Sequence, residues 1–236
     1  MRSLPLSFAA VLLLSACHSG DRDSAGGGRE GGQTSSNPMA FADAPGGGAT
    51  EAADSLVMRA QVALDRQGFS PGVIEGRENA SYGLALRGFQ EARGIPASGK
   101  LDPATQQALF SDKQSATRNV VIPRAFARGP FFPDLPKDMA GQAEFDHLGY
   151  RSMSEALGER FHTTPETLLA LNGPGTVLGA GRTIRVPDIP DAALAQIPDD
   201  KNGWAETLQR LGVAGEQPEA DHIVVDKSDG ALRAYD

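Results

Sequence analysis

In residues 54–110, glycines lie at the positions where helices are expected to end. This spacing constrains the fold more than any other feature of the chain. Gly68 and Gly94 each follow an apolar helical stripe, at the place where a helix end favours a left-handed residue. A third helix opens at Asp102-Pro103, a capping side chain followed by proline in the first turn. The two stripes consist of Leu56, Ala60, Ala63 and Leu64, then Tyr82, Ala85, Leu86, Phe89 and Ala92. The pattern predicts a bundle of three short helices.

Within this stretch the motifs are Gly68-Phe69, Ile74-Glu75-Gly76, Phe89-Gln90, Gly94-Ile95-Pro96 and Gly99-Lys100-Leu101-Asp102-Pro103-Ala104-Thr105. In this order they resemble the peptidoglycan-binding module of bacterial wall enzymes. The resemblance implies a cleft that binds murein, and the candidate contacts are Glu75, Gly76, Asn79, Ser81, Arg87 and Gln90. The alternative is that the first three serve turn geometry and that the side chains of Arg87 and Gln90 are merely solvated.

Composition favours several small units over one large core. The 236 residues include 28 glycines and 16 prolines, which indicates linkers and short elements. We therefore predict a multi-domain, mainly α chain. The formal net charge is -8 and no basic patch is visible, so a nucleic-acid partner is not expected.

The N-terminus carries the signs of export. A basic start and a short apolar run lead to Leu14-Ser15-Ala16-Cys17, so residues 1–17 are predicted to be a signal peptide. The last four residues resemble the lipobox of bacterial lipoproteins, which implies lipidation of Cys17 and a membrane partner. The alternative is a plain signal peptide that contains a cysteine. Residues 18–53 offer little to bury and are predicted to be a disordered tether. The expected location is the periplasmic side of the cell envelope, with the outer membrane favoured by His18.

Residues 111–149 are predicted to be a linker with a short strand at 120–123 and a helix at 138–147. Residues 150–190 then give two helices and an alternating strand. This run, from Glu159-Arg160-Phe161-His162 to Ile184-Arg185-Val186-Pro187, resembles the second half of a LysM domain, with a strand–helix–helix–strand order. The resemblance implies a possible glycan-binding loop that includes Asn172, Gly173 and Thr176. The alternative is a purely structural spacer.

Residues 191–220 form an acidic connector with one predicted helix at 202–211. Trp204 lies on the apolar stripe of that helix. A tryptophan at this spacing is predicted to be a core residue, and the alternative is a platform for stacking sugars.

Residues 221–236 consist of two alternating runs around an Asp-Gly turn, which predicts a β-hairpin. The hairpin sequence, and the order of units before it, resemble the start of the L,D-transpeptidase catalytic domain. In that family a cysteine nucleophile and a histidine base follow the hairpin. No such motif occurs in these 236 residues, so we interpret the chain as a truncated, non-catalytic part of such an enzyme and leave enzymatic activity open.

Other chemistry finds little support in the sequence. Two Glu-x-x-His spacings occur, at Glu144/His147 and Glu159/His162, but on short helices that do not suit a di-iron bundle. We expect no metal site and no cofactor.

The functional hypothesis is therefore peptidoglycan binding by a lipid-anchored envelope protein, the targeting region of an L,D-transpeptidase involved in cell wall cross-linking. The alternative is a structural or adaptor lipoprotein that docks a wall enzyme.

Overall fold

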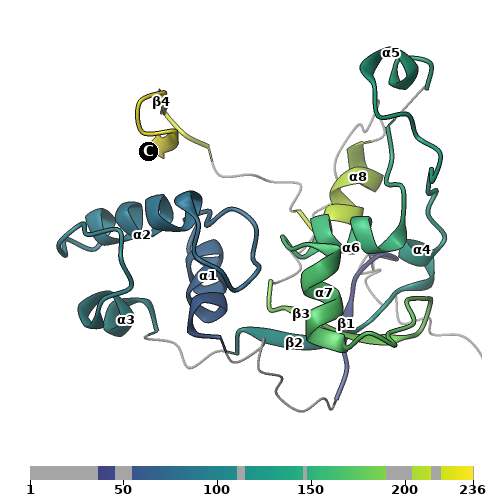
Figure 1. The fold of residues 1–236 in the computed structure, drawn as a ribbon, viewed down its shortest axis with the longest axis horizontal. Coiled ribbons are helices and arrows are strands. Elements are labelled where there is room, and N and C mark those ends of the chain that lie inside the picture. The colour runs from purple at the N-terminus through teal and green to yellow at the C-terminus, as the bar shows by residue number, and fades with distance from the viewer. Residues whose placement is uncertain are drawn as a thin grey trace, which may run out of the picture. The chain divides into compact units, whose positions relative to one another are not determined.

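The computed structural model describes residues 37–45, 55–110, 115–145, 148–189, 204–213 and 219–235. Over these ranges the fold is mixed α+β, with eight helices and two small antiparallel sheets (Figure 1). This corrects the mainly α expectation, because one of the sheets has three strands. The predicted signal peptide, Cys17 and most of the predicted tether lie outside the described residues.

Residues 55–110 form the predicted three-helix bundle (Figure 1). Its helices are α1 (Leu56–Arg66), α2 (Ala80–Ala92) and α3 (Pro103–Leu109). Each begins with a capping side chain that accepts a hydrogen bond from a first-turn N–H, and these caps are Ser55, Asn79 and Asp102. The core of the bundle consists of Ala60, Leu64, Tyr82, Ala85, Leu86, Phe89 and Leu109. The apolar stripes therefore meet as predicted.

Gln61 of α1 holds the first loop of the bundle. Its Oε1 accepts hydrogen bonds from the N–H groups of Glu75 at 3.2 Å and Gly76 at 2.8 Å. Its Nε2 donates to the carbonyls of Val73 at 3.3 Å and Arg77 at 3.0 Å. The side chain is fully buried. One glutamine thus satisfies four backbone groups of a loop that has little secondary structure of its own.

Gln90 of α2 holds the second loop in the same way. Its Oε1 accepts from the N–H of Gly99 at 2.8 Å, and its Nε2 donates to the Lys100 carbonyl at 3.0 Å and the Thr105 hydroxyl at 2.7 Å. This side chain is also fully buried. The bundle is therefore an internal repeat, in which a buried helix glutamine binds the glycine loop before the next helix cap. The spacing of glycines and apolar residues alone does not reveal this repeat.

A second unit is built around β2 (Thr117–Val121) and β3 (Thr183–Pro187), which pair antiparallel along their full length. Between them come α6 (Met153–Arg160) and α7 (Pro165–Asn172), so the order strand–helix–helix–strand is complete. The short strand predicted at 120–123, within the expected linker, overlaps β2, which begins three residues earlier and is the central strand of the three-stranded sheet. Its partner lies more than sixty residues away in the sequence, so local patterning could not reveal the pairing.

Between β2 and α6 lie two single-turn helices, α4 (Arg124–Ala127) and α5 (Met139–Gln142). The predicted helix at 138–147 is therefore wrong for residues 143–145, and residues 146–147 lie outside the described residues. Gly141 weakens it, and the ring of Phe145 turns to pack edge-on against Phe132, at 6.4 Å between centroids.

Residues 37–45 are not a disordered tether. β1 (Ala42–Asp43) pairs antiparallel with the end of β2. Phe41 is 5% exposed, and its ring packs edge-on at 5.0 Å from both Phe126 and Phe161. The prediction failed because Met39 and Phe41 are both buried, so two apolar side chains anchor a segment whose other residues are exposed or half-buried. We call residues 37–45 and 115–189 the α/β unit; the bundle is inserted between its first two strands.

Bundle and α/β unit share an apolar junction. Its buried members are Met58, Val62, Ile74, Ala116, Leu171 and Ile189. The backbone of Ile74 is bonded on both sides: its N–H donates to the carbonyl of His162 at 2.7 Å, and its carbonyl accepts from the Thr163 hydroxyl at 2.6 Å. The two parts are thus packed through a common core.

Charged groups reinforce this junction. Arg66 of α1 forms an ion pair with Asp188, just after β3, and its Nε donates to the Asp188 carbonyl at 2.8 Å. Asp188 also lies 3.5 Å from Arg118 of β2, which pairs with Asp43 of β1 at 2.9 Å. This network connects α1 with all three strands of the sheet.

The pair of His162 and Asp65 makes part of the junction sensitive to pH. The His162 Nδ1 lies 3.0 Å and 3.1 Å from the two Asp65 carboxylate oxygens. This bond raises the pKa of His162 above its ordinary 6.5, against the opposing effects of burial and Arg160 and with a small further rise from Glu159. Because the folded-state pKa is raised, the stabilisation is fully present below that ordinary value and is lost as pH rises through the raised one.

We therefore expect Asp65→Asn to lower the melting temperature more at about pH 5.5 than at about pH 9. Thermal unfolding followed by circular dichroism measures the two differences. An equal loss at both pH values would show that the charge on His162 does not stabilise the fold.

After a gap come α8 (Trp204–Leu211) and a hairpin of β4 (His222–Asp226) and β5 (Ala231–Tyr235). The hairpin confirms the prediction for this segment. Arg210 of α8 donates to the Gly129 carbonyl at 2.8 Å and lies over the Phe126 ring, so α8 packs on the α/β unit. Trp204 is 59% exposed, which corrects its assignment to the core.

Candidate functional site

Glu75 and Gly76 lie in the first loop of the bundle, where Gln61 binds both of their N–H groups. The Glu75 carboxylate forms an ion pair with Arg77 and is largely shielded from solvent, with 19% of its side chain exposed. Gly76 has a φ of 72°, in the left-handed region that favours glycine. The turn geometry expected of these residues is therefore present, and Glu75 presents a carboxylate already paired with a cation.

Asn79 and Ser81 lie at the start of α2. The Asn79 Oδ1 accepts from the Tyr82 N–H at 2.9 Å and caps the helix. Ser81 is exposed, and an ideal Cβ on Gly72 would lie 3.0 Å from its Cβ. Asn79 thus has a structural task, whereas Ser81 keeps its hydroxyl toward solvent.

Arg87 and Gln90, three residues apart on α2, lie in opposite environments. Arg87 is exposed beside Gly99 of the second loop. The Gln90 amide is buried and bonded to that same loop. Gln90 therefore supports the loop from inside, and no part of its side chain reaches the surface.

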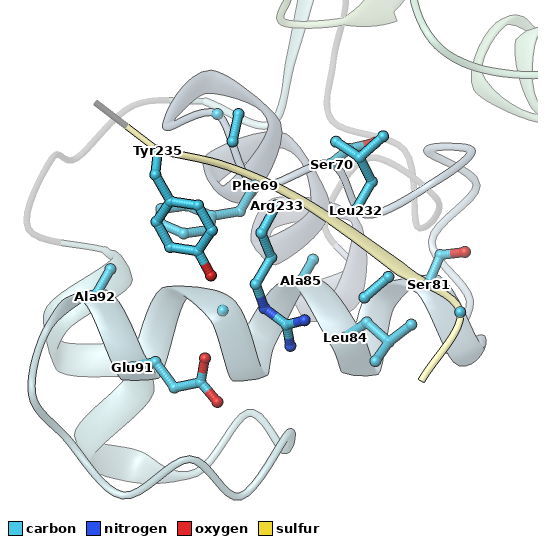
Figure 2. A pocket seen from close by; sticks show the side chains of 15 residues that line it. Phe69, Ser70, Ser81, Leu84, Ala85, Glu91, Ala92, Leu232, Arg233 and Tyr235 are labelled. Atoms are coloured by element: carbon cyan, nitrogen blue, oxygen red, sulfur yellow. The ribbon is translucent and has the colours of Figure 1, made fainter. Parts of the chain in front are cut away.

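The six candidates do not converge on one cavity, but α2 does border one. A cavity of about 850 Å³ lies over its exposed face, and we call it the α2 groove (Figure 2). Its lining residues are Gly68, Phe69, Ser70, Ser81, Leu84, Ala85, Gly88, Glu91, Ala92 and residues 230–235 of the hairpin. Ser81 is the one member of the six that takes part.

Sequence reasoning missed the rest of this groove, although a signal existed. Ser81, Leu84, Ala85, Gly88 and Ala92 recur at helical spacing beside the core stripe of α2. All but Leu84 are small, so they leave a hollow along the helix. In the sequence, Ser81 is a candidate contact and Ala85 and Ala92 belong to the predicted core stripe, whereas Leu84 and Gly88 have no predicted role.

The loop after α7 holds the second set of candidates. The Asn172 side chain donates to the carbonyls of Leu168 and Arg185 and accepts from the Arg185 N–H at 2.6 Å. Gly173 ends α7 with a φ of 91°, and the Thr176 hydroxyl donates to its carbonyl at 2.7 Å. Asn172 thus pins the loop to β3.

Asn172 and Thr176 also border a smaller cavity of about 280 Å³. Its other lining residues are Ser154, Pro165, Glu166, Leu168, Leu169, Leu178 and Ile184. The walls are mainly apolar with a few polar groups at the rim, as in sites that bind small neutral ligands. Gly173 does not line it.

In the part of the chain that the structure describes, no three His, Cys, Asp or Glu side chains gather as metal ligands would. Of the two Glu-x-x-His spacings, His162 turns to Asp65, and His147 lies outside the described residues. Among the helices described, none combines the length and the apolar character that a membrane crossing requires.

Comparison with known families identifies the bundle. Residues 53–109 match the family model described as "Putative peptidoglycan binding domain", a range that contains α1, α2 and α3. No curated protein matches the chain. The resemblance inferred from the glycine loops is thereby confirmed for the bundle, and peptidoglycan is its ligand. A domain of this kind indicates the cell envelope as the place of action.

Proposed function

We propose that this chain is the lipid-anchored targeting region of an L,D-transpeptidase, which holds the enzyme on peptidoglycan in the cell envelope. The family match at residues 53–109 carries the proposal. The geometry of the bundle supports it, because the helix caps and both glutamine-bound loops are formed, so the surface is preorganised for a ligand. The lipobox-like Cys17 supplies the membrane partner.

Within the bundle we propose that the exposed face around the first loop and α2 meets the ligand. Glu75, Gly76, Asn79, Ser81 and Arg87 are the contacts considered, and Gln90 acts by holding the second loop. In the α/β unit, Thr176 and the loop that Asn172 pins are a second, glycan-binding candidate. The strand–helix–helix–strand order of this unit favours its likeness to LysM.

Co-sedimentation with purified sacculi tests the proposal. The mature chain has a strong acidic excess and the wall carries carboxylates, so attraction between opposite charges does not favour binding. We expect the chain to pellet with sacculi at low and at raised salt, whereas an unrelated acidic protein of similar size stays in the supernatant. If both proteins pellet alike, the targeting function is wrong.

The transpeptidase part of the proposal rests on the resemblance of residues 221–235 and on the order of units before them. In that family the nucleophilic cysteine and its histidine follow this hairpin. The nucleotide sequence after the codon for Asp236 decides the matter. A reading frame that continues into a Ser-x-Gly-Cys motif supports the proposal, and unrelated sequence after a stop codon removes it.

The exposed hairpin favours one alternative, an adaptor that docks a separate wall enzyme by adding strands to its sheet. Ile223 and Val225 face the same side as their partners Ala234 and Leu232, and three of these four side chains are at least 60% exposed. Deleting residues 221–236 separates the readings. Loss of enzyme binding supports the adaptor, and retention of the enzyme after the deletion excludes it.

A further inference from the structure

The α2 groove offers a binding site that neither the family match nor the sequence analysis assigns. We propose that it binds the peptide stem of peptidoglycan, with the charged groups of the stem met by Glu91 and Arg233. The proposal deepens the proposed function and rests on it, since it names the part of the wall polymer that the bundle recognises.

The floor of the groove suits small apolar groups. Ala85 and Gly88 line the groove and leave the surface of α2 low. Phe69 and Leu84 form apolar sides (Figure 2). A Cβ on Gly88 would lie 3.5 Å from the Phe69 ring, so the absence of a side chain there opens the space above the helix. Alanine methyl groups recur along a peptide stem and fit hollows of this size.

The charges in the groove favour a peptide over a glycan. Figure 2 shows Glu91 rising from α2 and Arg233 reaching from β5 into the same space. Neither side chain forms an ion pair or a side-chain hydrogen bond with a described residue. A stem peptide carries carboxylates and, in its diamino acid, an amino group, so it can meet both charges. A neutral N-acetylated glycan meets neither.

The size of the groove agrees with this ligand. About 850 Å³ is within the range of roughly 300–1,000 Å³ typical of small-ligand sites and exceeds what a single amino acid fills. The groove is also long, because its lining runs from Ser81 to Ala92 along α2. An extended peptide of several residues is therefore the expected occupant.

The test uses the mature chain and two soluble probes: a stem tetrapeptide that contains a diamino acid, and an N-acetylglucosamine tetramer. Glu91→Gln and Arg233→Gln each remove one charge from the groove. The matched controls are Glu78→Gln, an exposed carboxylate of the same bundle, and Lys227→Gln, a cation in the turn of the same hairpin. Calorimetry measures each affinity, and circular dichroism verifies that every variant is folded.

We expect the tetrapeptide to bind, and each groove variant to weaken it about tenfold while the controls change it less than about twofold. Gly88→Leu fills the floor and is expected to abolish binding, although leucine suits a helix better than glycine. Unchanged affinity in all three groove variants, or binding of the glycan tetramer alone, would overturn the inference. Sacculus binding by the wild-type chain distinguishes failure of the groove proposal from failure of the proposed targeting function. If the chain binds sacculi but not the tetrapeptide, the groove proposal fails and the targeting function stands.

Discussion

Replacing Phe41 by alanine is expected to destabilise the chain by about 3–5 kcal/mol, the usual effect of removing a buried aromatic side chain. The Phe41 ring is 5% exposed, lies at 5.0 Å from the Phe126 and Phe161 rings, and has the Arg160 guanidinium 5.6 Å from its centroid. Its loss removes an aromatic contact on each side and leaves a cavity beneath β1. Urea unfolding followed by far-ultraviolet circular dichroism measures the free energy of unfolding.

Phe145→Ala is the matched control, because it makes the same chemical change at a ring that is 38% exposed. We expect it to lower the free energy of unfolding by about 1 kcal/mol or less. If Phe41→Ala lowered the free energy of unfolding by as little, residues 37–45 would not belong to the core. The prediction of a tether over the whole of residues 18–53 would then stand.

The position of β1 also changes the reach of the proposed anchor. If residues 18–53 were free, the flexible-chain estimate gives an r.m.s. span of roughly 30–35 Å from Cys17 to the bundle. With Phe41 buried, the predicted tether would extend only from residue 18 to about residue 36, and the same estimate gives it a span of roughly 25 Å.

The bundle was predictable because its signals are local. Capping residues, glycines after helices and apolar stripes act within one or two turns of chain, and α1, α2 and α3 lie where they placed them. The same holds for α6, α7, β3 and the terminal hairpin. In each of these, the residues that fix the element are its own or its immediate neighbours.

What escaped prediction depends on partners far away in the sequence. β1 is only two residues long, and the strand predicted at 120–123 covers only the end of β2; neither strand reveals its partner until β3 lies beside β2. Trp204 lies on a strongly amphipathic stripe, yet only the packing of α8 decides which part of that stripe is covered. The candidate contacts failed to converge for a related reason, since a polar residue such as Gln90 gives no sign in the sequence of whether it faces inward.

Gln90→Ala is expected to destabilise the bundle by about 2–4 kcal/mol, although it removes no apolar residue. The change leaves the Gly99 N–H and the Lys100 carbonyl without their bonds to the amide, and it opens space beside Thr105. A buried polar group that loses its partner carries the penalty of its desolvation, and the Thr105 hydroxyl, in a fully buried residue, loses the amide as a donor. Urea unfolding measures the loss, and amide exchange is expected to show faster opening at Gly99 first.

Gln67→Ala is the control, because that glutamine, the C-cap of α1, is exposed and forms its side-chain hydrogen bonds at the surface, so the change in stability is expected to be about 0.5 kcal/mol or less. Gln90→Glu adds a second test. It keeps the acceptor for the Gly99 N–H, but places a carboxylate in a buried site close to Asp102, whose Oδ1 accepts from Thr105 at 2.8 Å. Burial and the neighbouring charge raise the pKa of the new carboxyl above its unfolded value, so its destabilising effect grows as pH rises from about 4 to about 7.

An effect of Gln90→Ala no larger than that of Gln67→Ala would mean that the glycine loop holds its shape without the glutamine, and Gln90 would again be free to serve as a ligand contact.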